Sequence, residues 1–194
     1  FLLSLLIIKN TNVNFLLNTI LVTSAFYLFF VTLRDFFNKN FVNFAQNTAH
    51  FGFSLLILSI LFNNIFSKEI ITNLKVGETY QSKNFKIYFE DIETKNQQNY
   101  KAIIGKFKIQ NVDGNNEILK PELRIYNQPI IITSEADIKT SLLTDKFMTM
   151  NSIQNQDYFN VRYQIKPLMI WIWISVFLIT LGGLTSLLKK KYED

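Results

Sequence analysis

Residues 167–188 read PLMIWIWISVFLITLGGLTSLL and carry no charged side chain. A helix rises 1.5 Å per residue, so about 20 such residues cross the roughly 30 Å hydrocarbon core of a bilayer. A surface helix of a soluble protein would carry a polar face, and this stretch lacks one. We therefore predict that residues 167–188 form a transmembrane helix.

Two earlier stretches have the same character, at about 14–34 and about 48–66. The first, NFLLNTILVTSAFYLFFVTL, has no charge, and in the second, TAHFGFSLLILSILFNNIF, only His50 and two asparagines interrupt the apolar run. Residues 1–8, FLLSLLII, are apolar but too short to span, and we expect them to end another span. Residues 1–66 are thus predicted to form transmembrane helices.

The composition excludes several classes of protein. Only 18% of the residues are charged and 48% are hydrophobic, whereas soluble domains carry about 25% charged residues. The absence of cysteine excludes disulfides, thiolate metal sites and a cysteine nucleophile, and the single histidine excludes a histidine cluster within this chain. The net charge is +5 without a basic stripe interleaved with aromatic residues, so we expect no nucleic-acid partner.

Residues 67–166 concentrate residues that favour β-strands. The expected strands are 85–89, 102–109, 122–126, 130–132 and 158–165. Short strands separated by turn residues indicate a small antiparallel sandwich or barrel. Ser134, followed by Glu135 and Asp137, is expected to begin a short helical or loop excursion. The predicted fold class is an integral membrane α-helical protein, with about three transmembrane helices and an inserted extramembrane antiparallel β domain.

Basic residues near the spans predict the topology. Arg34 and Lys39 lie between the first two spans, and the tail 189–194 begins with three lysines. Placing both sets on the inner side satisfies the positive-inside rule and puts 67–166 outside. Trp171 and Trp173 then fall where an outer aromatic belt is expected.

The β domain offers no strong catalytic constellation. Glu90, Asp91 and Glu93 are more typical of a solvated turn than of a cation site. Ser134 has no histidine nearby with which to form a hydrolytic triad. Gly182 and Gly183, inside the third span, are expected to permit close helix contact.

His50 is the one residue with possible cofactor chemistry. An ionisable side chain at membrane depth is costly and tends to be functional, and a neutral imidazole is a common axial ligand of haem iron. The alternative is a histidine hydrogen-bonded to a neighbouring helix. Gly52 nearby would let either a macrocycle or another helix approach. If His50 is a ligand, a second chain must supply any second histidine.

Several motifs occur in an order that resembles a known family. These are Thr48-Ala-His-Phe-Gly52, then Leu119-Lys-Pro-Glu-Leu-Arg-Ile-Tyr126, Thr133-Ser-Glu-Ala-Asp-Ile138 and Thr144-Asp-Lys-Phe147, and finally Ile165-Lys-Pro-Leu-Met-Ile-Trp-Ile-Trp173 before Leu181-Gly-Gly-Leu184. From about residue 14 onward, the chain resembles the C-terminal part of CcmF, the haem lyase subunit of cytochrome c maturation system I. Mitochondrial relatives of that family are often split, so a separate C-terminal piece is expected.

The resemblance implies a role for His50. It occupies the place of a family histidine that is an axial ligand of haem b within the membrane, so His50 is the expected haem-iron ligand. The family's tryptophan-rich haem-handling segment and its second haem ligand lie upstream and are expected on other haem lyase subunits. Further implied partners are a haem chaperone, a thiol-reducing protein, apocytochrome c and membrane lipid. The implied location is the mitochondrial inner membrane with the β domain in the intermembrane space, or a bacterial inner membrane with it in the periplasm.

Two hypotheses follow. In the first, the chain is a haem b-binding membrane component of a cytochrome c haem lyase and is not catalytic alone. In the second, it is a non-catalytic structural or interaction subunit of a larger membrane assembly and binds no haem.

Overall fold

The structure is a computed structural model that describes residues 15–37, 44–111, 114, 116–153 and 157–193. The described residues fall into two compact units. A helical unit contains the helices together with Ser141–Thr144, and a β unit contains Lys68–Thr140 and Asp145–Lys166. Residues 1–8, expected to end another span, and Lys39, in the expected inner loop, lie outside the described residues.

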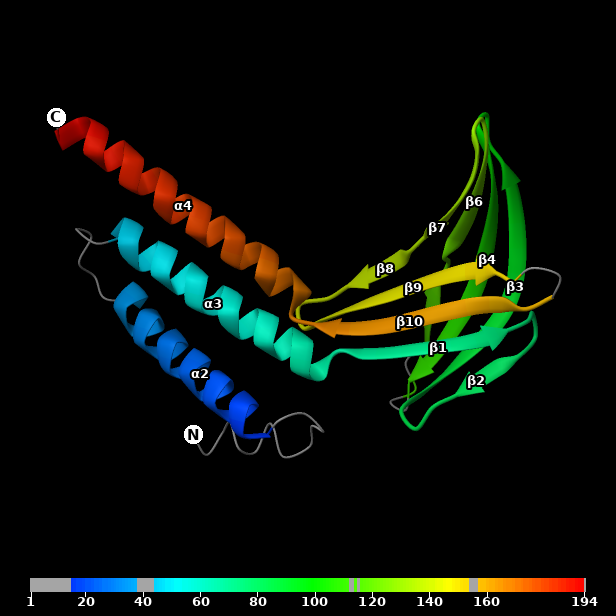
Figure 1. Ribbon diagram of the computed structural model, residues 1–194, viewed down its shortest axis with the longest axis horizontal. Helices are drawn as coiled ribbons and strands as arrows, with labels where there is room; N and C mark the ends of the chain where they lie inside the picture. The colour runs from blue at the N-terminus through cyan, green and yellow to red at the C-terminus, as the bar shows by residue number, and fades with distance from the viewer. Residues whose placement is uncertain (1–14, 38–43, 112–113, 115, 154–156, 194) are drawn as a thin grey trace. The chain divides into compact units, whose positions relative to one another are not determined.

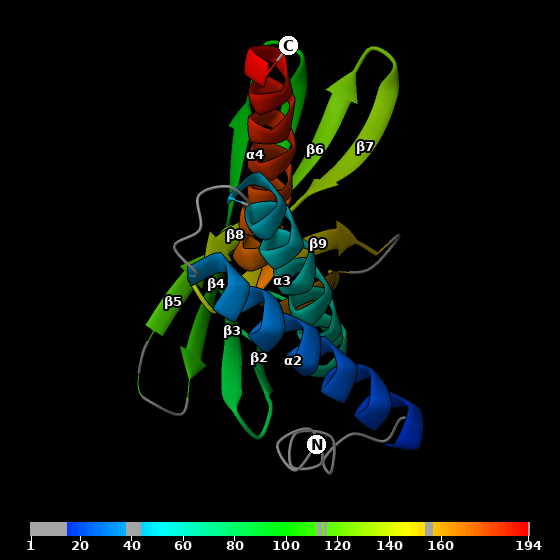
Figure 2. The ribbon, with the colours of Figure 1, turned by 90° about the vertical axis from the view of Figure 1, so that its left-hand side faces the viewer.

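Three long helices make up the helical unit: α2 (Phe15–Phe37), α3 (Phe44–Phe66) and α4 (Met169–Glu193). Each contains a segment long and apolar enough to cross a membrane, namely Leu16–Phe37, Phe44–Phe66 and Met169–Leu188. The prediction of three membrane-length helices is confirmed. Two views show α3 lying between α2 and α4 (Figure 1, Figure 2).

Ten strands make up the described part of the β unit. They are β1 (Lys68–Leu74), β2 (Thr79–Gln81), β3 (Phe85–Asn96), β4 (Tyr100–Asn111), β5 (Asn116–Leu119), β6 (Glu122–Asn127), β7 (Ile130–Glu135), β8 (Asp137–Thr140), β9 (Thr144–Ser152) and β10 (Phe159–Pro167). One sheet has the order β1-β10-β9-β8 and the other β2-β3-β4-β6-β7, with β5 also paired to β4. The pairings resolved between these strands are antiparallel, as expected for short strands joined by tight turns.

The core of the β unit is built by alternation along the strands. In β3, Phe85, Ile87 and Phe89 are buried while the residues between them are exposed, the period-2 pattern of a strand with one face on the core. Phe89 stacks on Phe107 with ring centroids 4.2 Å apart. The sheet β1-β10-β9-β8 contributes Met148, Met150, Val161 and Tyr163 to the same core. The fold is therefore the predicted antiparallel β domain, with its own hydrophobic core.

The excursion expected at Ser134 is wrong. Ser134 and Glu135 end β7, and Asp137 begins β8. Ser134 pairs with Leu123 of β6, and its hydroxyl donates to the carbonyl of Met150 at 2.8 Å. Serine before acidic residues favours a helix start locally, but tertiary pairing supplies the backbone and hydroxyl with other partners.

Candidate functional site

His50 lies in the second turn of α3, and its side chain is exposed. Within the described residues, no hydrogen bond to its imidazole occurs. Neither α2 nor α4 therefore supplies a hydrogen bond to His50, and both expected roles, haem-iron ligand and hydrogen-bond partner of a neighbouring helix, remain predictions.

The three sides of α3 explain this exposure. One side contacts α2, where the Thr32 and Ser54 hydroxyls lie 2.6 Å apart and Phe51 packs on Phe36 with ring centroids 5.0 Å apart. Because 3.6 residues make one turn, residues at spacings of three and four share a side. Ser54 and Phe51 therefore share the α2 side.

The second side of α3 contacts α4 very closely. A Cβ added at Gly52 would lie 2.9 Å from the backbone nitrogen of Ile179, and one added at Gly182 would lie 2.7 Å from the backbone nitrogen of Ala49. These small residues let the two backbones approach, as in many membrane helix pairs. Gly52 thus accommodates another helix, one of the two uses expected of it, and α4 fills the space that a macrocycle would need there.

The third side of α3 has no partner among the described residues. It carries Gln46, His50, Phe53 and Ile60, all exposed, with 53% of Phe53 and 49% of Ile60 accessible. His50 is the one ionisable group on this otherwise largely apolar side. The arrangement therefore presents the His50 imidazole outward from the three-helix unit, on a helix long and apolar enough to cross a membrane.

Two members of the acidic group Glu90, Asp91 and Glu93 make local contacts. Lys106 lies 3.2 Å from Glu90, and the amide of Ile92 donates to the Asp91 carboxylate at 2.8 Å. Among the described residues, no group of three or more His, Cys, Asp or Glu side chains could hold a metal ion.

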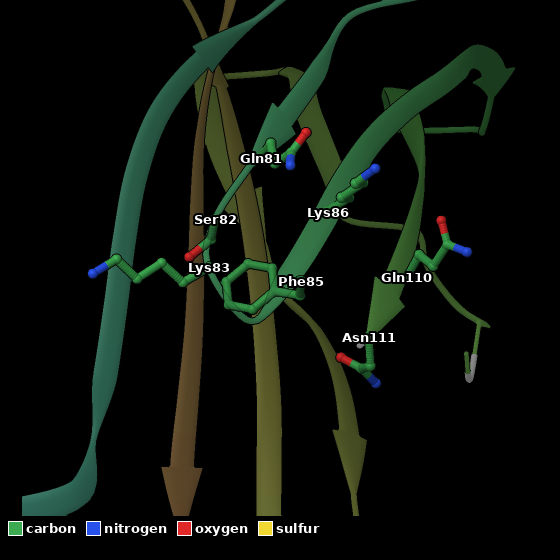
Figure 3. A pocket seen from close by; sticks show the side chains of 7 residues that line it. All are labelled: Gln81, Ser82, Lys83, Phe85, Lys86, Gln110 and Asn111. Carbon is green, nitrogen blue, oxygen red and sulfur yellow. The ribbon is translucent and has the colours of Figure 1, made fainter. Parts of the chain in front are cut away.

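A pocket of about 310 Å³ lies at the end of the β2–β3 hairpin and of β4 (Figure 3). It is lined by Gln81, Ser82, Lys83, Phe85, Lys86, Gln110 and Asn111. In Figure 3, Lys83 and Lys86 extend on opposite sides of the Phe85 ring. The lining is polar and cationic, but no buried unpartnered polar group points to a particular ligand.

The described molecule is, by class, a membrane protein of three spanning helices that carries an antiparallel β-sandwich between its second and third spans. The family described as "CcmF C-terminal beta-sandwich" matches residues 65–167, more than half of the chain. The chain belongs to the CcmF family, as its C-terminal part.

Individual relatives agree with this assignment. The chain is 30% identical to "Cytochrome c-type biogenesis protein CcmF" of Haemophilus influenzae, over 85% of this chain and 25% of the relative. It is 26% identical to the protein of the same name from Escherichia coli, over 75% of this chain and 22% of the relative. A solved structure of "Cytochrome c Heme Lyase CcmF" matches with a TM-score of 0.65 and 18% identity, over 94% of this chain and 33% of that one. The chain therefore spans about a quarter of the length of these curated relatives.

Sequence reasoning singled out His50 but missed two sets of residues. The Thr32–Ser54 hydrogen bond joins α2 to α3, and no sequence spacing links residues on different helices. Leu142 and Leu143 join the helical unit although they lie between two strands. The one sequence feature that could have indicated this is that two adjacent leucines occur in an otherwise polar turn.

Proposed function

We propose that this chain is a membrane component of the machinery that attaches haem covalently to apocytochrome c, and that His50 supplies one axial ligand to haem b. The supporting observation is the exposed imidazole on the unpartnered, apolar side of α3. A neutral imidazole offers a nitrogen lone pair to iron, and the surrounding apolar side chains suit a porphyrin. The available residues therefore fit the group, with one ligand from this chain.

The other residues of the helical unit would position that ligand. The close contacts of Gly52 and Gly182 and the Thr32–Ser54 hydrogen bond hold α3 against its two neighbours. Fixing α3 in this way fixes the direction in which His50 points. When bound, haem b would supply a redox-active iron. The second ligand would come from another polypeptide, because this chain has one histidine.

The other parts of the proposal rest on the family and on the basic residues that flank the spans. The β unit would lie in the intermembrane space or periplasm, where it would contact apocytochrome c, a haem chaperone or other haem lyase subunits. Covalent attachment would be carried out by those other subunits. The mitochondrial inner membrane is the proposed location of a split form.

A second candidate is a structural subunit without haem. The same side of α3 that exposes Phe53 and Ile60 would pack well against a helix of another subunit. In that case His50 would be hydrogen-bonded across the interface.

The test is a reduced-minus-oxidised visible spectrum of the purified native complex with His50→Ala, His50→Met and Gln46→Ala. Gln46 is one turn earlier on the same side, so Gln46→Ala controls for altered packing. We expect a b-type α band that His50→Ala removes, that added imidazole restores, and that His50→Met shifts, with Gln46→Ala unchanged. A complex that assembles without haem contradicts the ligand role, and so does an α band that His50→Ala leaves unchanged. Either result favours the structural subunit.

A further inference from the structure

The turn between β8 and β9 carries two neighbouring leucines that are largely exposed. Leu142 and Leu143 each have 67% of their surface accessible. The turn is closed locally, because the Ser141 amide and hydroxyl both donate to the carbonyl of Thr144, at 3.1 and 2.6 Å. Two adjacent leucines at the tip of such a turn are costly to hold in water.

This turn is bound to the start of α4. The amide of Leu168 donates to the carbonyl of Leu143 at 2.8 Å, and the indole N–H of Trp171 donates to the carbonyl of Leu142 at 2.7 Å. In agreement with these bonds, Ser141–Thr144 groups with the helical unit and not with the β unit.

The start of α4 is also the start of a membrane-length apolar segment. The membrane-length segment begins at Met169, directly after Leu168. The side-chain amide of Asn63, near the end of α3, donates to the carbonyl of Pro167 at 2.7 Å, so the ends of two spans meet here. Trp173, with 70% of its surface accessible, and Trp171 lie in the first turns of α4, and tryptophan favours the interface between headgroups and acyl chains.

We propose that Leu142 and Leu143 insert into the interfacial region of the lipid bilayer, and that Trp171 holds their turn, Ser141–Thr144, against the first turn of α4. The occupant of this apolar surface is phospholipid at the boundary of headgroups and acyl chains. Lipid is the expected occupant because the turn adjoins a membrane span: two of its main-chain carbonyls accept hydrogen bonds from residues at the start of α4. The chain would thus have a shallow membrane anchor in addition to its spanning helices, independent of any bound haem.

The chain is well suited to a direct test because it contains no cysteine. Leu142→Cys and Leu143→Cys, each labelled with a fluorophore that brightens in apolar surroundings, would be measured in the full chain in lipid vesicles. Vesicles would contain nitroxide lipids with the quencher either near the headgroup or near the bilayer centre. Phe177→Cys, on an exposed position deeper in α4, is the positive control, and Gln98→Cys, in the polar run 96–99, is the aqueous control.

We expect both labels in the turn to lose fluorescence by about twofold with the shallow quencher and less with the deep one. The Phe177→Cys label should show the opposite order, and the Gln98→Cys label should respond to neither. Labels at 142 and 143 that behave like Gln98→Cys overturn the proposal. Labels that are bright but unquenched by lipid also overturn it, because protein then covers the turn.

A second comparison tests the role of Trp171. Trp171→Phe keeps the aromatic ring but removes the N–H that binds Leu142, whereas Trp173 makes no such bond among the described residues, so Trp173→Phe is its matched control. In the Leu142→Cys background, Trp171→Phe should reduce quenching by the shallow nitroxide and Trp173→Phe should not. Equal effects of the two variants would show that Trp171 does not hold the turn.

Discussion

Gly182 of α4 lies directly against the backbone of Ala49 on α3. A Cβ at position 182 would meet the Ala49 nitrogen at 2.7 Å and the Ala45 carbonyl oxygen at 2.7 Å. Real Cβ atoms do not approach backbone atoms so closely, so any larger residue must push the two helices apart. Ala49 immediately precedes His50, and this contact therefore bears on the placement of the proposed ligand.

Gly182→Ala should destabilise the helical unit, whereas Gly183→Ala should not. Overpacking at Gly182 is expected to cost about 1–3 kcal/mol. A Cβ at Gly183 meets nothing within 4 Å, so Gly183→Ala should be neutral or gain up to about 1 kcal/mol of helix propensity. Unfolding of the full chain by sodium dodecyl sulfate in mixed micelles measures both. Equal effects would mean that the close α3–α4 contact is absent.

The Thr32–Ser54 hydrogen bond should couple α2 to α3. Thr32→Val, Ser54→Ala and the double variant form a cycle, with an expected coupling of about 0.6 kcal/mol, typical of hydrogen bonds between membrane helices. Thr180→Val is the control, because that hydroxyl is exposed and bonds within α4, to the carbonyl of Val176. Its coupling with Ser54→Ala should be near zero. If the destabilising effects of Thr32→Val and Ser54→Ala simply add in the double variant, as expected for the control pair, the interhelical hydrogen bond is contradicted.

Phe107→Ala should strongly destabilise the β unit. Phe107 and its stacked partner Phe89 are fully buried, so truncation is expected to cost about 3–5 kcal/mol. Tyr88 lies between buried residues of β3 but is 38% exposed, and Tyr88→Ala should cost less than about 1 kcal/mol. Urea titration followed by the circular dichroism of β-sheet checks the difference. Similar midpoints for the two variants would argue against the core described above.

Tyr163 should make the β unit sensitive to alkaline pH. Burial raises the pKa of its phenol well above the ordinary value, and the charge of Glu117 adds to the rise. Above about pH 10 the unfolded chain loses this proton while the folded chain keeps it, so stability present below that pH is lost as pH rises.

Tyr163→Phe removes this titration. The hydroxyl is buried without a hydrogen-bond partner among the described residues, so its loss at pH 7 should be neutral or stabilising by up to about 1 kcal/mol. Thermal unfolding between pH 7 and pH 11 should show a smaller alkaline loss for Tyr163→Phe than for the control Tyr88→Phe, whose phenol is exposed. Parallel profiles for the two variants would refute the buried titration.

Local pattern determined much of this protein. Unbroken apolar runs predicted the three membrane-length helices, and the alternation of Phe85, Ile87 and Phe89 predicted a strand with one face on a core, because both signals arise within one segment. Ordered motifs from Thr48 to Leu184 were enough to identify the family. The same local reasoning failed at Ser134, where pairing with distant residues decided the outcome.

Only the tertiary structure decided which side of α3 faces which neighbour. A helix that is apolar all round carries no sequence signal to separate a lipid-facing side from a helix-facing one, so the sequence could place His50 at membrane depth but not on an unpartnered side. It also could not assign Leu142 and Leu143 to the helical unit, because their hydrogen bonds reach Leu168 and Trp171, far along the chain. Hydropathy measures the free-energy cost of exposing a residue to water. Which neighbours a buried residue contacts depends on how distant parts of the chain pack together.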